Sequence, residues 1–272
     1  MIGSSPDMDH LTAVPQIFRI RRRSEATDIV RIPAGGRHIV LHVEEGARVA
    51  VAGNFGPSEV EAVLEEGAHL EILRVVRADG ISPCVSHFKA RLAAGSSLRS
   101  FFFTRGESGV SDSINVVLEG AGAGVFLNGL HLLAGEAKAE STTNIEHAAP
   151  STTSDQLYKC LLRDKAYSLF NGSILVRREA QLTNAYQLNK NMLLSTQARA
   201  DTRPELEIFA DDVKCSHGAT IGHMDHDQLF YLQTRGIDKA MAGEMLMNGF
   251  VEDVVDRISD VRLREEVQRS LR

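Results

Sequence analysis

A cysteine and a histidine, Cys215 and His217, lie two residues apart in an apolar, alternating stretch. Thiolate and imidazole both bind iron and iron–sulfur clusters. On a β-strand, residues two apart project from the same face, so both side chains would approach one ligand. Alternatively the pair lies in a core, because Val213 and Ile221 have the same parity and free cysteine is often buried. Both hypotheses remain open at this point.

A third interpretation makes Cys215 a nucleophile that His217 activates. Two-residue spacing on a strand separates parallel side chains by roughly 6–7 Å, about twice the strand rise. That separation is too long for a hydrogen bond between nucleophile and base. No phosphate loop of the GxxxxGK[ST] type occurs either, so we expect no ATP hydrolysis by this chain.

The remaining cysteines and several histidines have more ordinary explanations. We expect Cys84 and Cys160 to be structural, and His147 to lie at a turn or a strand end. His223 and His226 lie beside aspartates and could bind metal, but a polar connector is the favoured interpretation. The three cysteines are far apart and form no CxxC pair, which argues against disulfides and structural zinc.

The composition excludes several classes of protein. The chain has 272 residues and a formal net charge of −6, which argues against nucleic acid as its main partner. No apolar run approaches the roughly 18 residues that a membrane span needs. The first residues show no charged start followed by an apolar run, so we expect no signal peptide and a cytoplasmic protein.

A glycine-centred pattern recurs through the first half of the chain. An apolar residue, two small or acidic residues, a glycine and then alternating apolar residues appear at 43–49, 64–70 and 92–98, with a degenerate copy at 118–123. The glycines, at 46, 67, 95 and 120, are 21, 28 and 25 residues apart, the period of a β-solenoid coil. Each glycine could turn the chain at positive φ. The competing fold is an antiparallel sandwich or jelly roll.

The second half keeps strand character and then changes. Asn171-Gly172 is a turn signal between apolar runs. After Asp227, Arg235-Gly236 predicts a helix stop, and apolar residues at three- and four-residue steps then indicate an amphipathic helix. The charged residues 260–272 predict a last helix. This helical segment is expected to cap the solenoid, to dock a partner, or both.

Three stretches resemble a known family. Residues 199–222 closely resemble the signature of the SufB/SufD family, and of its SufD branch in particular. Residues 227–237 look like the start of that family's C-terminal helices, and 191–195 fit the same pattern. The specific match covers about residues 144–258, whereas 30–143 match only in style.

The resemblance implies a right-handed parallel β-helix core with a C-terminal helical segment. We therefore expect a short N-terminal arm at 1–25, the β-helix at 26–226, and helices at 227–272 that dock the ATPase partner. It also implies a non-enzymatic scaffold for iron–sulfur cluster assembly, working with a SufB-like paralogue and the SufC ABC-type ATPase. The last β-helix strands would contact the paralogue or a second copy of the chain. His217, with Cys215, would hold a transient cluster shared across that contact, and no cofactor would be bound permanently.

The sequence departs from the family in two places. Longer members carry an N-terminal helical domain where this chain has about 25 residues, so any role of that domain is in doubt. SufB-like members carry a cysteine where Lys190 or Asn191 stands here, which favours the SufD branch and an accessory role. The alternative function is a secreted-type β-helix carbohydrate-active enzyme, but its acidic candidates, Glu44-Glu45 and Glu65-Glu66, lie at turn-like positions.

Overall fold

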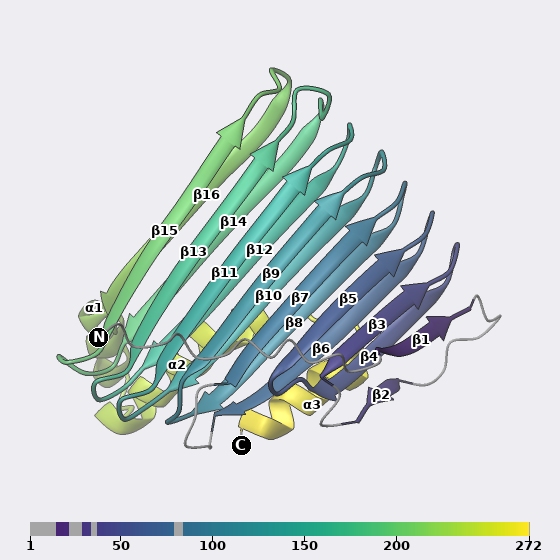
Figure 1. Cartoon of the computed structure of the whole chain (residues 1–272). Coiled ribbons are helices and arrows are strands. Elements are labelled where there is room, and N and C mark those ends of the chain that lie inside the picture. Colours follow the sequence, from purple (N-terminus) through teal and green to yellow (C-terminus); the bar gives the residue numbers. More distant parts are fainter. Residues whose placement is uncertain (1–14, 22–28, 34–36, 79–83, 272) are drawn as a thin grey trace, which may run out of the picture.

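The chain winds back and forth between two parallel β-sheets that lie face to face (Figure 1). The computed structural model describes residues 15–21, 29–33, 37–78 and 84–271. Successive strands alternate between the sheets, so each coil contributes one strand to each. Every strand pairing is parallel. This confirms the expected parallel β-solenoid and excludes the antiparallel sandwich.

Within the described ranges each sheet has eight strands. The odd-numbered sheet contains β1 (Gln16–Ile20), β3 (His38–Val43), β5 (Ser58–Leu64), β7 (Cys84–Leu92), β9 (Val110–Leu118), β11 (Lys138–His147), β13 (Tyr167–Val176) and β15 (Arg199–Ile208). The even-numbered sheet contains β2 (Val30–Ile32), β4 (Arg48–Asn54), β6 (His69–Ala78), β8 (Ser97–Gly106), β10 (Gly124–Leu133), β12 (Thr153–Leu162), β14 (Thr183–Leu193) and β16 (Val213–His223). The strands lengthen along the stack, from 3–7 residues in the first five to 9–11 in the rest.

Glycines turn the chain in the early coils, as expected. Gly46, Gly67 and Gly95 have φ values of 62°, 63° and 62°, a region that costs other residues energy. In the fourth coil the positive φ of 72° belongs to Gly122, so the assignment of that turn to Gly120 was wrong. A side chain at Gly120 is excluded for another reason, since its Cβ would lie 1.9 Å from the backbone nitrogen of Ala94.

Later turns follow a different rule. Ser151, Asp164 and Leu182 take positive φ values of 59°, 53° and 61° at turns where no glycine stands. The turn predicted at Asn171-Gly172 is wrong, because both residues lie inside β13. Gly172 is needed there for space: a Cβ on it would lie 2.1 Å from Nε2 of Gln187 on the facing strand β14.

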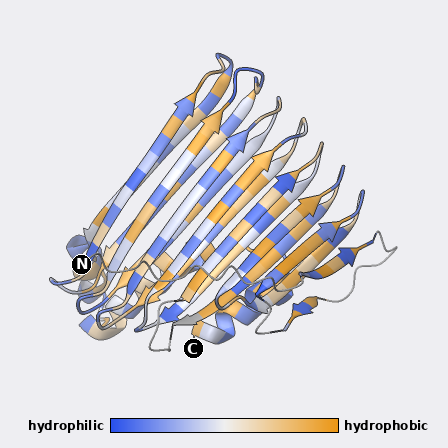
Figure 2. Cartoon of the chain, viewed as in Figure 1, coloured by the Kyte–Doolittle hydropathy of each residue, from blue (hydrophilic) through white to orange (hydrophobic). Residues whose placement is uncertain are grey.

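Buried residues alternate with partly exposed ones along strands such as β9 and β13, and the strands pair in register with their neighbours. Figure 2 shows hydrophobic and hydrophilic residues along the same strands. Buried apolar residues form a core between the sheets. That core also contains an ion pair: Arg74 donates to both carboxylate oxygens of Asp112 at 2.7 and 2.9 Å. Both side chains are buried, and the guanidinium lies 5.0 Å from the Phe88 ring centre and 4.8 Å from that of Phe102.

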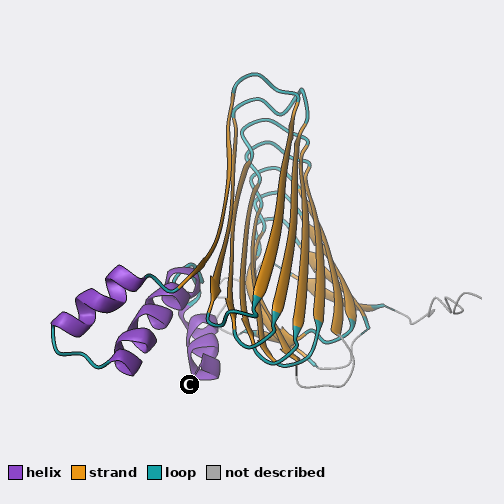
Figure 3. Ribbon diagram, turned by 90° about the vertical axis from the view of Figure 1, so that its left-hand side faces the viewer, coloured by secondary structure: helices purple, strands orange, loops and turns teal. Residues whose placement is uncertain are grey.

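Three helices follow the last strand: α1 (His226–Thr234), α2 (Lys239–Val255) and α3 (Val261–Leu271). Helix α1 ends before Gly236, which has a φ of 84°, as the sequence predicts. The apolar residues of α2 and α3 pack on the outer face of the even-numbered sheet, against Leu73, Phe101 and Leu130 among others. Figure 3 shows the helices beside the stacked strands. The prediction that the helices cap the end of the solenoid was therefore wrong. The outer face of the even-numbered sheet is itself apolar, and the helices cover that face instead.

The N-terminal segment is described only in part. Strand β1 falls inside the expected arm at 1–25 and pairs with β3, so it belongs to the first coil. Residues 1–14 and 22–25 of that arm lie outside the described residues.

Candidate functional site at the last coil

The last coil has a neighbour on one side only. Strand β15 pairs with β13 and β16 pairs with β14, and each ends its sheet. Their inward positions continue the columns of buried residues in the coils before them, yet none is buried, and Ile208 and Ile221 are 39% and 45% exposed. Side chains that face the interior are therefore accessible at this end of the solenoid.

Cys215 and His217 both lie on the inward face of β16. In register, Cys215 stands beside Ala185 and His217 beside Gln187, both of which are buried. Cys215 is half-buried and packs against the apolar core, and this burial raises the pKa of its thiol despite a backbone hydrogen bond at Ala185. His217 is exposed. The same-face prediction is confirmed, and neither residue is enclosed in the core.

A strip of buried amides leads inward from His217. Gln187 lies next to it in register, and Gln156 lies next to Gln187. Both glutamines are buried, and neither amide nitrogen nor amide oxygen has a hydrogen-bond partner among the described residues. Buried side-chain amides normally form hydrogen bonds, so we expect bound water to be their partner. The site therefore has a polar interior behind it.

The other sequence candidates lie elsewhere or have structural roles. Cys160 is buried in the core, and burial raises the pKa of its thiol to about 12. His147 ends β11, is buried, and contacts the hydroxyls of Thr152 and Ser154 at 2.7 and 2.9 Å. His223 ends β16 and His226 begins α1, which agrees with a polar connector. Within the described ranges, no three His, Cys, Asp or Glu side chains gather closely enough to hold a metal ion.

The two free strand edges of the last coil differ in charge. Strand β15 carries five charged residues on its outward positions and also Pro204, whose backbone has no N–H to donate. Such features block further strand pairing at an edge. Strand β16 carries Lys214 as its only residue of Lys, Arg, Asp or Glu type, and it has no proline. The edge of β16 is therefore open to another strand.

Sequence reasoning missed an exposed apolar patch on α1 and α2. No residue of α1 is buried, and Phe230 and Tyr231 are 68% and 57% exposed. Met241 and Met245 of α2, expected on the apolar face of their helix, are 55% and 47% exposed. We call these four residues the hairpin patch. A hollow of 450 Å³ lies beside it, lined by Tyr231, Leu232 and Leu246 among others.

Sequence reasoning also missed the contact that ties α2 to the solenoid. Lys159 of β12 points outward beneath α2, where it is 2% exposed. Its ammonium donates to the carbonyl of Phe250 at 2.7 Å and lies 2.5 Å from Oδ2 of Asp253. Burial lowers the pKa of Lys159, while Asp253 acts in the opposite direction. A lysine among the apolar residues of β12 was the available signal.

Comparisons with known proteins identify the family. The family model "SUF system FeS cluster assembly, SufBD core domain" matches residues 30–250. The iron-sulfur cluster assembly protein SufD of Escherichia coli is 31% identical over 236 residues, which cover 84% of this chain and 56% of that protein. The chloroplastic protein ABCI7 of Arabidopsis thaliana is 29% identical, with 89% of this chain and 53% of that protein covered.

A SufBD family protein of Synechocystis is 43% identical over 129 residues, which cover 47% of this chain and 28% of that protein. The chain thus spans about half the length of the curated relatives it matches over most of its own length. No helix among the described residues is long and apolar enough to cross a membrane. With a parallel solenoid, C-terminal helices and a family match over most of its length, the chain belongs to the SufB/SufD family of SUF-system iron–sulfur cluster assembly proteins and is SufD-like.

Proposed function

We propose that this chain is one half of an iron–sulfur assembly scaffold, working beside a SufB-like paralogue and a SufC-like ABC ATPase without turnover of its own. The observation that supports the proposal is the uncovered last coil. It has an open strand edge at β16 and inward-facing side chains of types that bind metal. The family is one of assembly components, which supports the scaffold role. We expect the assembly to work in the cytoplasm, although the relative ABCI7 is chloroplastic.

The paralogue would pair with the edge of β16. An added strand would satisfy the free N–H and C=O groups of that edge, which is the usual basis of strand addition. It would also cover the half-exposed interior face, including Ile208 and Ile221. The charged residues and Pro204 of β15 oppose pairing on the other sheet, so we assign the main backbone contact to β16.

The cluster would be bound as cargo at this contact, by His217 and with help from Cys215. Within the described part of the chain no cluster of three ligand-type residues occurs, so remaining ligands would come from the paralogue. Only the thiolate form of cysteine binds metal. Because burial raises the pKa of Cys215, proton release would accompany iron binding there. This suits transient holding better than permanent binding.

The ATPase would dock on the helical segment at 227–272, through the hairpin patch. That patch is apolar and exposed on a helix pair, a typical surface for partner binding. Lys159 links α2 to β12, and β14 alone separates β12 from β16. Movement of the docked helices would therefore be passed to the last coil through this tether, and so alter the paralogue contact.

The test uses two reciprocal variants in a co-expression with the ATPase and paralogue of the same organism. Phe230→Glu places a charge on the hairpin patch, and Ala219→Glu places one on the exposed inward face of β16. Native mass spectrometry should show that Phe230→Glu loses the ATPase and keeps the paralogue, while Ala219→Glu does the reverse. Binding of neither partner by the unmodified chain would refute the scaffold proposal.

The ligand assignment needs a separate measurement on assembled complexes. His217→Ala should leave the stoichiometry unchanged, because it removes only an exposed side chain. It should lower the iron and sulfide content after reconstitution, because it removes the proposed ligand. Cys215→Ser should lower it less, and Cys84→Ser, on a half-buried cysteine of β7, serves as the matched control. Unchanged iron content in the His217 variant would exclude it as a ligand while leaving the partner contacts standing.

A further inference from the structure

A pocket lies on the outer face of the even-numbered sheet, far from the last coil. It has a volume of 240 Å³ and opens between strands β4, β6 and β8 and the segment that joins α2 to α3. Four strands, β8, β10, β12 and β14, separate β6 from β16 in the sheet. The pocket is therefore distinct from the candidate cluster site and from the hairpin patch.

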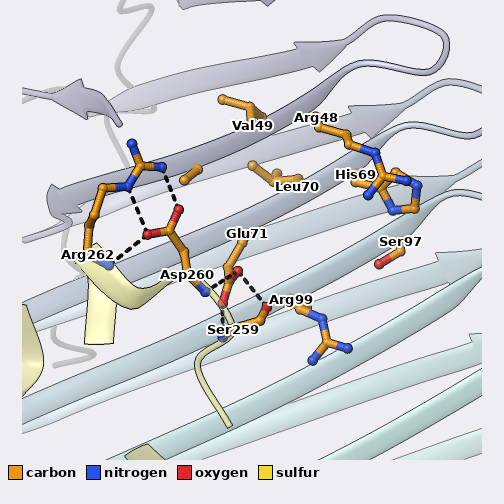
Figure 4. A pocket seen from close by; sticks show the side chains of 11 residues that line it. Arg48, Val49, His69, Leu70, Glu71, Ser97, Arg99, Ser259, Asp260 and Arg262 are labelled. Atoms are coloured by element: carbon orange, nitrogen blue, oxygen red, sulfur yellow. Dashed lines mark hydrogen bonds and ion pairs between the residues drawn. The ribbon is translucent and has the colours of Figure 1, made fainter. Parts of the chain in front are cut away.

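Nitrogen and hydroxyl donors from three strands line one side of this pocket. Arg48, His69 and Ser97 form a row across β4, β6 and β8, each in register with the next (Figure 4). Adjacent strands are about 4.8 Å apart, so the three side chains are close neighbours. Arg99 lies two residues beyond Ser97 and therefore on the same face. These four residues form what we call the basic row.

Both carboxylates of the pocket, those of Glu71 and Asp260, already accept hydrogen bonds from neighbouring residues. Glu71 accepts hydrogen bonds from the backbone N–H and the hydroxyl of Ser259, both at 2.7 Å, and from the N–H of Asp260 at 3.0 Å. Asp260 in turn accepts from the guanidinium of Arg262 at 2.6 Å. Figure 4 shows these bonds on the side of the pocket formed by the α2–α3 segment. Among the described residues, neither carboxylate forms an ion pair with Arg48 or Arg99.

The two arginines of the basic row have no ion-pair partner in the described part of the chain. Among the residues that the structure describes, neither Arg48 nor Arg99 forms an ion pair with an acidic side chain. Arg99 lies over the ring of Phe126 at 4.1 Å, which orients its guanidinium. Burial, and then the charge of Arg48, lower the pKa of His69. A bound anion would interact favourably with both guanidinium groups.

We propose that the basic row binds a phosphate-class oxyanion, either free or as the terminal group of a small phosphorylated metabolite. Guanidinium groups offer paired N–H donors that match such oxygens, and Ser97 adds a hydroxyl. The volume of 240 Å³ lies below the roughly 300–1,000 Å³ of pockets for larger ligands, so a small anion fits.

The experiment titrates the whole 272-residue chain with inorganic phosphate, pyrophosphate and ATP by calorimetry, at constant ionic strength. We expect one site per chain. Arg48→Gln and Arg99→Gln should each weaken binding at least about tenfold, since each removes a charged hydrogen-bond donor. The matched control is Arg91→Gln, an exposed arginine of the other sheet that pairs with Glu119, and it should bind like the unmodified chain.

A second measurement does not depend on calorimetric heat. Phosphate should raise the midpoint of thermal unfolding for the unmodified chain and for Arg91→Gln, but not for Arg48→Gln or Arg99→Gln. Tightest binding of inorganic phosphate would identify a free anion as the ligand, and tightest binding of ATP a nucleotide phosphate. Absence of saturable binding for all three probes, or equal weakening in the Arg91 control, would overturn the proposal without affecting the scaffold function.

Discussion

Polar residues face the interior both in the middle coils and in the last coil, but only those of the middle coils are buried. Asp112 and Gln187 are 1% and 2% exposed, whereas Cys215 is half-buried and His217 is exposed at equivalent inward positions. Strand parity decides which way a side chain points, and the following coil decides whether water reaches it. In a solenoid, inward-facing side chains are therefore accessible where the stack of coils stops.

The largest expected difference between the two regions concerns the ion pair. Asp112→Ala leaves the guanidinium of Arg74 buried without its carboxylate, which should lower the free energy of unfolding by about 3–5 kcal/mol. His217→Ala, at an exposed inward position, should change it by less than about 0.5 kcal/mol. Urea unfolding followed by circular dichroism measures both values. Similar values for the two variants would contradict the proposed difference in burial between the middle coils and the last coil.

A smaller difference is expected between Gly129, which lies inside β10, and Gly222, which lies on the edge strand β16. A Cβ on Gly129 of β10 would lie 2.3 Å from the ring of Tyr158, which is itself buried, so Gly129→Ala should cost about 1–3 kcal/mol. Gly222 of β16 has no atom within 4 Å of the added carbon, so Gly222→Ala should stay within about 0.5 kcal/mol. Denaturation midpoints would show the contrast. A destabilised Gly222 variant would mean that the last coil is as tightly packed as the middle.

Protonation of His131 in the middle coils should make the stability of the chain depend on pH. Burial lowers its pKa from 6.5 to about 4, while Asp112 raises the pKa and Arg74 lowers it, both by smaller amounts. Between these pH values the unfolded chain binds a proton that the folded chain does not, so the free energy of unfolding falls as the pH drops from 6.5 to 4. The slope from one such histidine is at most about 1.4 kcal/mol per pH unit.

His131→Leu should therefore reduce the pH dependence of stability in that window. The hydroxyl of Ser141, 3.0 Å from Nε2 of His131, loses its partner, so the variant should also be less stable at every pH. The slope and not the absolute stability is the test. Urea unfolding at several pH values between 6.5 and 4 would measure it, and an unchanged slope would contradict a buried neutral histidine.

Local sequence signals predicted the early coils well, because glycine turns are a local property. Gly46 and Gly67 take the positive φ values that their pattern suggested. The pattern fails in later coils, where Leu182 adopts positive φ without any sequence signal. It also fails at Gly172. This residue must be small because the side chain of Gln187 on the facing strand β14 lies against it, and a local sequence pattern does not reveal that contact.

The site was predictable in orientation but not in exposure. Alternation along β16 was enough to place Cys215 and His217 on one face. Their access to water depends on where the α helices go, and helical periodicity cannot distinguish a cap at the end from a cover on the outer face. The hairpin patch illustrates the same limit, since Met241 and Met245 follow the apolar period of α2 but are exposed.

The unguarded edge of β16 has a consequence for subunit dosage. An unpaired parallel strand is a template for any compatible strand, including the first coil of a second copy. Contacts between unlike ends do not close on themselves and generate open filaments. We therefore expect chain produced without the proposed paralogue to associate head to tail, and pairing of the β16 edge with that paralogue to prevent this aggregation.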